Sequence, residues 1–353
     1  MAYTTINKHT DHFNTKLYTG TGSSNAITGV GFQPDLVWLK SRSAAWDHEW
    51  YDAVRGAGYS ISSVNSNAQG SSPQGVTAFD SDGFTVGTRS GANENNSTYA
   101  SWNWKANGQG SSNTDGSTNT TYTSVNSTAG FSISTYAGTG SAATIGHGLG
   151  AAPEVVLIKC TTHTENWVMY HKSLNSSGAG TYIYLNTTAA SGGSGSNTSI
   201  FNNTAPTSSV FTVNTDGVSN GSGKSYVAYC FKEKPGYSKF GSYKGNGSTD
   251  GTFVYTGFKP AFVIYKGAIG ANAADNWEMA DNKRSPHNGV ENVLYPNLGN
   301  AEGTGVTTRM DLLSNGFKMR TGATDYNGSG QTYIYMAFGQ SLVGSNNVPC
   351  TAR

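Results

Sequence analysis

The 353-residue chain is short of charge and of long apolar runs. Charged residues make up 12% of it, and 22 basic against 21 acidic residues leave a net charge of +1. So few and so balanced charges offer no attraction to a polyanion, so nucleic acid is not expected as a partner. No apolar run approaches the roughly 18 residues of a membrane-spanning helix, so membrane insertion is not expected either. The N-terminus has no apolar signal-peptide core, which leaves the usual secretory route unsupported.

Cysteine is scarce as well. Cys160, Cys230 and Cys350 have no CxxC or other metal-ligand spacing. Free thiols are expected, as in a protein made in a reducing cytosol, with a Cys160–Cys230 disulfide as the alternative because both residues fall in predicted strands. No paired histidine spacing indicates zinc and no phosphate-binding loop is present, so neither a metal nor a cofactor is expected.

The chain is instead rich in Gly, Ser, Thr, Asn and Tyr, with 46 glycines and 20 tyrosines. This composition is typical of short strands joined by many turns. Within it, one unit is written three times. Each copy begins with an aromatic–glycine signature, which reads YTGTGS from Tyr18, YAGTGS from Tyr136 and YKGNGS from Tyr243.

The other landmarks of the unit follow in the same order. An apolar run opens at a proline and closes at a lysine, as in QPDLVWLK (33–40), APEVVLIK (152–159) and KPAFVIYK (259–266). An Asp/Asn-Gly turn comes next, in SDGFTV (81–86), TDGVSN (215–220) and SNGFKM (314–319). Aromatic segments end the copies: STYASWNW (97–104), KSYVAYCF (224–231) and QTYIYMAF (331–338).

These segments predict strands and very little helix. The runs are short and rich in β-branched and aromatic residues, and the last closing segment alternates, with Tyr333 and Tyr335 on one face and Ile334 and Met336 on the other. We therefore predict an all-β chain of three tandem β-sandwich repeats, with a jelly roll as one form. The predicted parts are an N-terminal arm (1–12), repeat 1 (13–105), a flexible Gly/Ser/Thr/Asn linker (106–130), repeat 2 (131–235), repeat 3 (236–340) and a C-terminal tail (341–353).

Candidate site residues are few. Asp52-x-x-Arg55 recurs as Asp281-x-x-Arg284, a spacing that predicts a loop-ordering ion pair, with ligand binding as the alternative. No nucleophile motif is present and no acidic pair recurs in all copies, so catalytic residues are not expected and the protein is predicted not to be an enzyme. Trp and Tyr on strands most often fill cores, but some could form stacking platforms for sugars. The candidates for such ligand-facing aromatics are Trp46, Trp50, Trp167 and Trp277.

The first repeat also carries a family resemblance. Segments 17–56, FDSDGFTVG (79–87), YASWNWKANG (99–108) and the ending GQSLVGSNNVPCTAR (339–353) resemble a repeat-domain family of uncharacterised structural proteins, of tail-fibre or appendage type, in marine tailed bacteriophages. The resemblance is closest in the first copy and weakest in the second. It implies a virion protein made in the bacterial host cytoplasm, whose three domains each bury a core of their own, and it supplies no catalytic residues.

The expected function is accordingly a non-enzymatic virion structural protein, a tail fibre or spike that contacts the host surface. Its expected partners are other virion proteins and a host surface glycan or protein, with a homo-oligomer, a trimer in the first place, as its assembly state. The alternatives are a capsid decoration protein anchored by the N-terminal arm, a polysaccharide depolymerase, and a filament-forming assembly protein.

Overall fold

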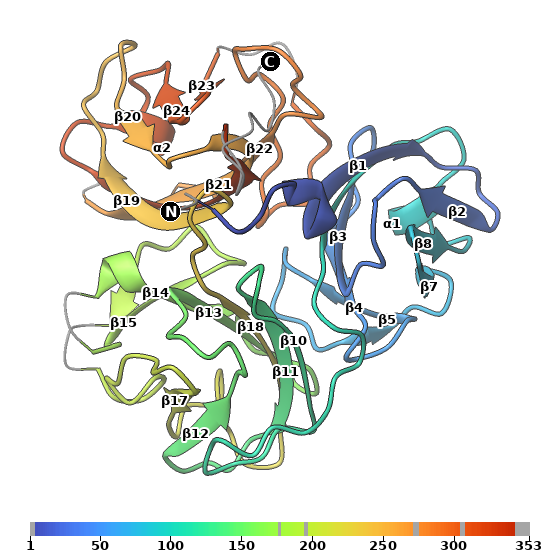
Figure 1. Ribbon diagram of the computed structural model, residues 1–353, viewed down its shortest axis with the longest axis vertical. Coiled ribbons are helices and arrows are strands. Elements are labelled where there is room, and N and C mark those ends of the chain that lie inside the picture. The colour runs from blue at the N-terminus through green and yellow to red at the C-terminus, as the bar shows by residue number, and fades with distance from the viewer. Residues whose placement is uncertain (1–3, 176–177, 194–196, 271–274, 304–307, 343–353) are drawn as a thin grey trace.

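The computed structural model describes residues 4–175, 178–193, 197–270, 275–303 and 308–342. It is all-β with little helix, as predicted, and its three sandwich-like units surround a common centre (Figure 1). The few helical turns are η1 (His9–Asp11), α1 (Ser90–Asn93), η2 (Lys172–Leu174) and α2 (Thr324–Asn327). Among the described residues, no helix is long and apolar enough to cross a membrane.

Each unit consists of a large inner sheet and a small outer sheet, both antiparallel. In repeat 1 the inner sheet has the order β1 (Phe13–Thr19), β9 (Thr98–Trp104), β3 (Leu36–Ser41), β4 (Glu49–Asp52), β5 (Tyr59–Ser62) and β6 (Gly70–Ser71). Its outer sheet has the order β2 (Asn25–Thr28), β8 (Gly83–Val86) and β7 (Val76–Asp80).

Repeats 2 and 3 keep this plan. The inner sheet of repeat 2 contains, in order, β10 (Tyr122–Asn126), β11 (Phe131–Ala137), β18 (Ser225–Phe231), β13 (Val155–Cys160), β14 (Val168–His171), β15 (Thr181–Tyr184) and β16 (Gly192–Gly193), and its outer sheet pairs β12 (Ala143–Gly146) with β17 (Val210–Val213). In repeat 3 the inner order is β19 (Ser238–Lys244), β25 (Thr332–Gln340), β21 (Lys259–Ile269) and β22 (Glu278–Asp281), and the outer order is β20 (Phe253–Tyr255), β24 (Gly316–Met319) and β23 (Met310–Leu313).

The two faces of every inner sheet are both buried, but against different partners. On β25, Tyr333 and Tyr335 pack under the outer sheet of their own repeat, whereas Ile334, Met336 and Phe338 face the middle of the molecule. This is the alternation expected of a strand, whose successive side chains point to opposite faces. Each repeat thus has a private core between its sheets, and all three share a central core.

The central core combines aromatic and aliphatic side chains of all three repeats. The ring of Phe338 lies 5.4 Å from that of Phe13 and 5.9 Å from that of Phe231, which belong to the other two repeats. An apolar cavity of about 20 Å³ lies among these side chains. Each domain thus buries a core of its own, as expected, but the inner face of each large sheet also depends on the other two repeats.

Two of the predicted connecting segments are part of this packed structure. The segment 106–130 is not a flexible linker, because it contains β10, which pairs with β11 along its whole length. The start of its backbone is also held by specific bonds, because both carboxylate oxygens of Asp35 accept from the backbone N–H groups of Ala106 and Gly108. In the N-terminal arm, Ile6 belongs to the central core and the N–H of His9 donates to Gln340 Oε1 at 2.8 Å.

Candidate functional site

The aromatic–glycine signature forms the same corner in every repeat, which consists of two stacked tyrosines and a glycine loop. In repeat 1, Tyr18 stacks on Tyr99 of the closing strand with ring centroids 5.0 Å apart. The glycines have structural reasons: a Cβ on Gly20 would meet the Glu94 carbonyl oxygen at 2.1 Å, and Gly22 has a φ of +69°. The equivalent stacked pairs are Tyr136–Tyr226 at 5.2 Å and Tyr243–Tyr333 at 4.9 Å. The signature is therefore a scaffold element, not a phosphate loop.

A buried asparagine completes each corner. Asn93 accepts from the Thr21 N–H through Oδ1 at 2.8 Å and donates to the Ser23 and Gly87 carbonyl oxygens. Asn220 and Asn327 make equivalent bonds in the other repeats. Sequence reasoning missed these residues, although each precedes the closing-strand tyrosine by six positions.

The seams between adjacent repeats also recur three times and close the molecule into a ring. A backbone N–H of one repeat donates to the carbonyl oxygen two residues after the lysine that closes the apolar run in the next repeat. These bonds run from Gln69 to Thr161 at 2.9 Å, from Ser191 to Ala268 at 3.0 Å and from Glu302 to Arg42 at 2.8 Å. The last of them joins repeat 3 back to repeat 1.

The closing lysines lie fully buried beside these seams. Lys159 Nζ donates to the carbonyl oxygens of Cys160 and, across the seam, Ser66, and Lys266 Nζ does the same with Gly267 and Thr188. Desolvation lowers the pKa of Lys40, Lys159 and Lys266 to about 8 in each case. Among the described residues, no carboxylate lies within ion-pair distance of these three amino groups, so their burial is costly, and backbone oxygens offset part of that cost.

The two D-x-x-R pairs form buried ion pairs at the seams. Arg55 Nε lies 2.5 Å from Asp52 Oδ2, and Arg284 Nε lies 2.6 Å from Asp281 Oδ2. Each aspartate also meets the next repeat around the ring, since Asp52 Oδ2 accepts from the Tyr229 hydroxyl at 2.7 Å. Asp281 Oδ2 accepts likewise from Trp102 Nε1 at 3.1 Å. The arrangement orders loops and seams, as the predicted ion pair would.

Repeat 2 fills the same place without charge. His171 stands where the other repeats have aspartate, and burial lowers its pKa to about 4, so the ring is neutral near pH 7. Its Nε2 lies 3.3 Å from the backbone oxygen of Tyr335 in repeat 3. Leu174 replaces the arginine, which avoids a buried cation with no partner.

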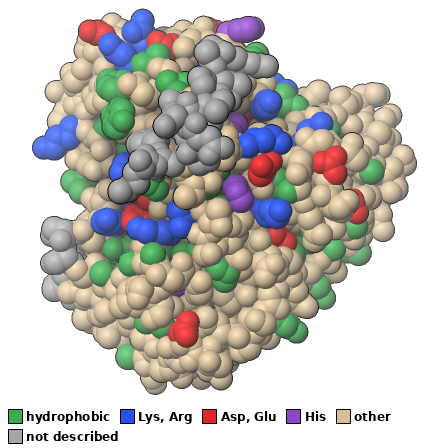
Figure 2. Space-filling view, in the orientation of Figure 1, with side chains coloured by type: hydrophobic (Ala, Val, Ile, Leu, Met, Phe, Trp, Pro, Cys, Tyr) green, Lys and Arg blue, Asp and Glu red, His purple; other side chains and the backbone are tan. Residues whose placement is uncertain are grey.

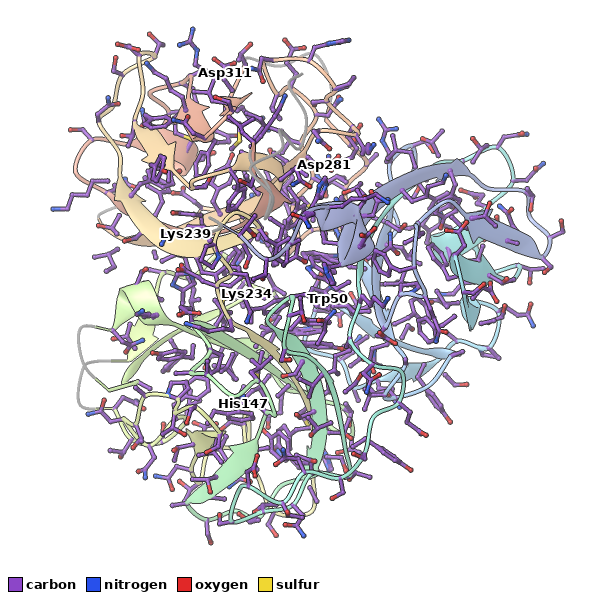
Figure 3. The ribbon with its side chains drawn as sticks, in the orientation of Figure 1. Trp50, His147, Lys234, Lys239, Asp281 and Asp311 are labelled. Carbon is purple, nitrogen blue, oxygen red and sulfur yellow. The ribbon has the colours of Figure 1, made fainter. Side chains whose placement is uncertain are left out.

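The structure places the predicted ligand-facing tryptophans differently from the expectation. Trp50, Trp167 and Trp277 are at most 3% exposed and face the central core, so they cannot stack on a ligand; only Trp46, at 40%, is exposed (Figure 3). The Nε1 groups of Trp167 and Trp277 donate across the seams to the carbonyl oxygens of Ser62 and Tyr184. Register shows that His48, not Trp50, is their equivalent in repeat 1.

Two further expectations concern repeat 2. The sequence pattern predicts that the Asp216-Gly217 pair forms the turn before the outer strand, as Asp82-Gly83 does in repeat 1. The strand register instead makes Phe211 of β17 the equivalent of Phe84, so Asp216-Gly217 lies after this strand. Cys160 and Cys230 are free, buried thiols, so the alternative disulfide is not formed. Cys350 lies outside the described residues.

The outer faces, in contrast to the corners and seams, differ among the repeats. On the edge strand of repeat 3, Phe253 and Tyr255 are 44% and 61% exposed. Strand register assigns small residues to these two positions elsewhere: Ala26 and Thr28 in repeat 1, and Thr144 and Gly146 in repeat 2. Because the scaffold is common to all three, a feature found in one repeat alone is the better candidate for a binding function.

Charged side chains surround this aromatic pair. Lys318 lies opposite Phe253 on β24 and pairs with Asp250 at 2.5 Å, and Arg320 pairs with Asp311 at 3.3 Å. We call these six residues, Asp250, Phe253, Tyr255, Asp311, Lys318 and Arg320, the repeat 3 outer face. Figure 2 shows hydrophobic side chains next to basic and acidic ones over this part of the molecule, and Asp311 lies at its outer rim in Figure 3.

An open hollow of about 520 Å³ lies beside charged members of this face. Three members of the outer face line it, namely Asp250, Asp311 and Arg320, together with Asn288 and Thr308. The lining offers carboxylate and carbonyl acceptors next to guanidinium and amide donors. In the described part of the chain, no group of three or more His, Cys, Asp or Glu residues is arranged to hold a metal ion.

Comparison with known proteins gives a family but no function. A family model described as "Domain of unknown function (DUF7483)" matches residues 8–341, which include all three repeats. No curated protein and no solved structure matches the chain significantly. Because this match covers almost the whole chain, the chain belongs to the DUF7483 family.

Proposed function

We propose that the protein is a non-enzymatic structural component of a bacteriophage virion, in an appendage such as a tail fibre or spike that contacts the host surface. The observation that carries the proposal is the division of the ring into a repeated scaffold and one distinctive face. Corners and seams recur three times around one shared central core, while two neighbouring exposed aromatic residues, Phe253 and Tyr255, lie on the outer sheet of repeat 3 where the described outer sheets of repeats 1 and 2 have small residues. The other exposed aromatic residues that the structure describes, Trp46 and Tyr59, lie outside the outer sheet of repeat 1. The resemblance of the first repeat to phage appendage proteins supports the same reading.

The architecture suits a protein that works outside the cell. Buried aromatic packing and closed seams hold the ring together without a disulfide between Cys160 and Cys230. The ring completes its threefold core within one chain, so assembly of several chains would serve attachment rather than folding. The expected trimer of chains belongs to this proposal.

A capsid decoration protein is the second candidate, because of the internal threefold arrangement. Three equivalent lobes around one axis would fit a threefold or quasi-threefold position on a shell (Figure 1). The arm that this alternative uses as an anchor is, however, packed into the ring from residue 4 onward, with Thr4 and Ile6 buried.

Cryo-electron microscopy of the native particle tests both candidates. We expect a few copies at a tail or fibre position, with repeat 3 directed away from the particle. A regular array over the capsomers would refute the appendage proposal in favour of decoration, and particles that lack the chain, checked by mass spectrometry of purified virions, would refute both.

A further inference from the structure

We propose that the repeat 3 outer face binds a neutral saccharide, with Phe253 and Tyr255 as the stacking platform. The inference deepens the proposed host contact and rests on it for its biological meaning, although the binding itself can be tested without a virion. Both rings are on one face of edge strand β20, where residues two apart are separated by roughly 7 Å. Adjacent sugar units of a glycan could therefore each lie against one ring.

The aromatic pair is exposed at a position where packing does not require it. Val254, between the two rings, is the residue that fills the private core of repeat 3. The structurally equivalent strands of repeats 1 and 2 form the same sheet with Ala, Thr or Gly on this face. Large apolar side chains that are exposed without a structural need indicate a binding surface.

The shape of the surface beneath the rings supports stacking. Phe253 lies over Gly316 of the neighbouring strand, where an added Cβ would come within 3.1 Å of Phe253 Cε2. No side chain therefore rises beside that ring from position 316. The C–H groups of a pyranose face carry small positive charges and pack favourably against the negative face of an aromatic ring.

The charges around the platform select against an ionic ligand. Asp250 neutralises Lys318, and Asp311 neutralises Arg320, so the face has two positive and two negative groups and no net charge. Each group keeps free hydrogen-bonding capacity, since a carboxylate has about four acceptor sites and a guanidinium five donors. Sugar hydroxyl groups, which donate and accept at once, are the complement of such a mixed surface, and the hollow lined by Asn288 and Thr308 could hold the next unit.

The experiment compares the full chain with two double variants of opposite expectation. The probe is an array of purified bacterial surface polysaccharides and their oligosaccharides, both neutral and anionic, followed by calorimetric titration of the strongest binder. Phe253→Ala/Tyr255→Ala removes the platform, and Thr28→Ala/Thr144→Ala changes matched outer-face positions in the other repeats. We expect the wild type and the Thr variants to bind the same neutral glycan, and the platform variant to bind it at least about tenfold more weakly with an unchanged melting temperature.

Tyr255→Phe separates stacking from hydrogen bonding and should keep most of the affinity. Absence of any bound neutral glycan, or equal binding by the platform variant, would overturn the proposal. If the wild type binds no glycan and the platform variant has a different molar mass in solution by light scattering, the two rings would instead belong to an interface between copies of the protein. Glycan binding by a protein found outside the virion would leave this inference standing and refute the appendage.

Discussion

Truncation of Phe338 to Ala tests whether the three repeats are one cooperative unit. The side chain is 2% exposed and its ring neighbours come from all three repeats. Replacing a buried Phe with Ala costs about 3–5 kcal/mol from lost burial and the cavity left behind. At about 2.1 cal/mol/K per residue, 353 residues give an unfolding entropy of about 0.7 kcal/mol/K, so the melting midpoint should fall by roughly 4–7 °C.

Hydrogen exchange distinguishes a shared core from three independent ones. Phe338→Ala should speed exchange in the inner strands of every repeat and leave a single calorimetric transition. The control is Phe317→Ala, which removes an equally buried ring from the private core of repeat 3 and should act mainly within that repeat. Faster exchange confined to repeat 3 in the Phe338 variant, or three separate transitions, would show that the central core does not couple the repeats.

Three further outcomes follow from the buried polar groups. Glu302→Gln weakens ion pairs to two arginines at the seam that closes the ring, one of which is fully buried, and should lower the free energy of urea unfolding by about 3 kcal/mol. The control Asp250→Asn changes an exposed carboxylate and should lower it by less than about 0.5 kcal/mol. Equal losses in the two variants would contradict the role of the seam. Desolvation raises the pKa of Glu278 in the folded protein to about 8, so its contribution to stability is complete below about pH 4.5 and is lost as the pH rises through 8. Glu278→Gln should remove this dependence of the unfolding free energy on pH, which urea unfolding at several pH values measures. An unchanged pH dependence would exclude this carboxyl group as its source. Burial raises the pKa of the Cys230 thiol, so iodoacetamide should label it only on unfolding, and fast labelling of the native protein by mass spectrometry would show that the strand opens.

Much of the fold was predictable because the chain states it three times. The landmarks of the unit gave its strands, and the alternation along Thr332–Gln340 gave two distinct faces. That both faces are buried, one of them at a common centre, was not predictable, because a single repeat looks alike whether its partner is solvent or another repeat. Trp50 shows the difficulty: it lies in a segment with His48, Glu49 and Asp52, and only the closed ring makes it a core residue.

The repeat 3 outer face was harder to predict from the sequence. Phe253, Val254 and Tyr255 form a short continuous apolar run, a pattern that is consistent with a fully buried strand and gives no sign of two exposed rings. Their significance appears only when register aligns them with Ala26, Thr28 and the corresponding residues of repeat 2. Asn327 could have been found from its fixed distance to the closing tyrosine, but nothing in the pattern states that its amide holds the glycine loop.

The contact between the arm and the last strand means that a chain with its repeats in a different order along the sequence could form the same ring. Gln340 binds the arm twice, accepting from the His9 N–H at 2.8 Å and donating to the Asn7 carbonyl oxygen at 3.1 Å. The seam from repeat 3 to repeat 1 is built from the same backbone bond as the two seams that the chain crosses covalently. A circular permutant that joins these ends by a short linker and opens the chain between repeats 1 and 2 would therefore keep every seam.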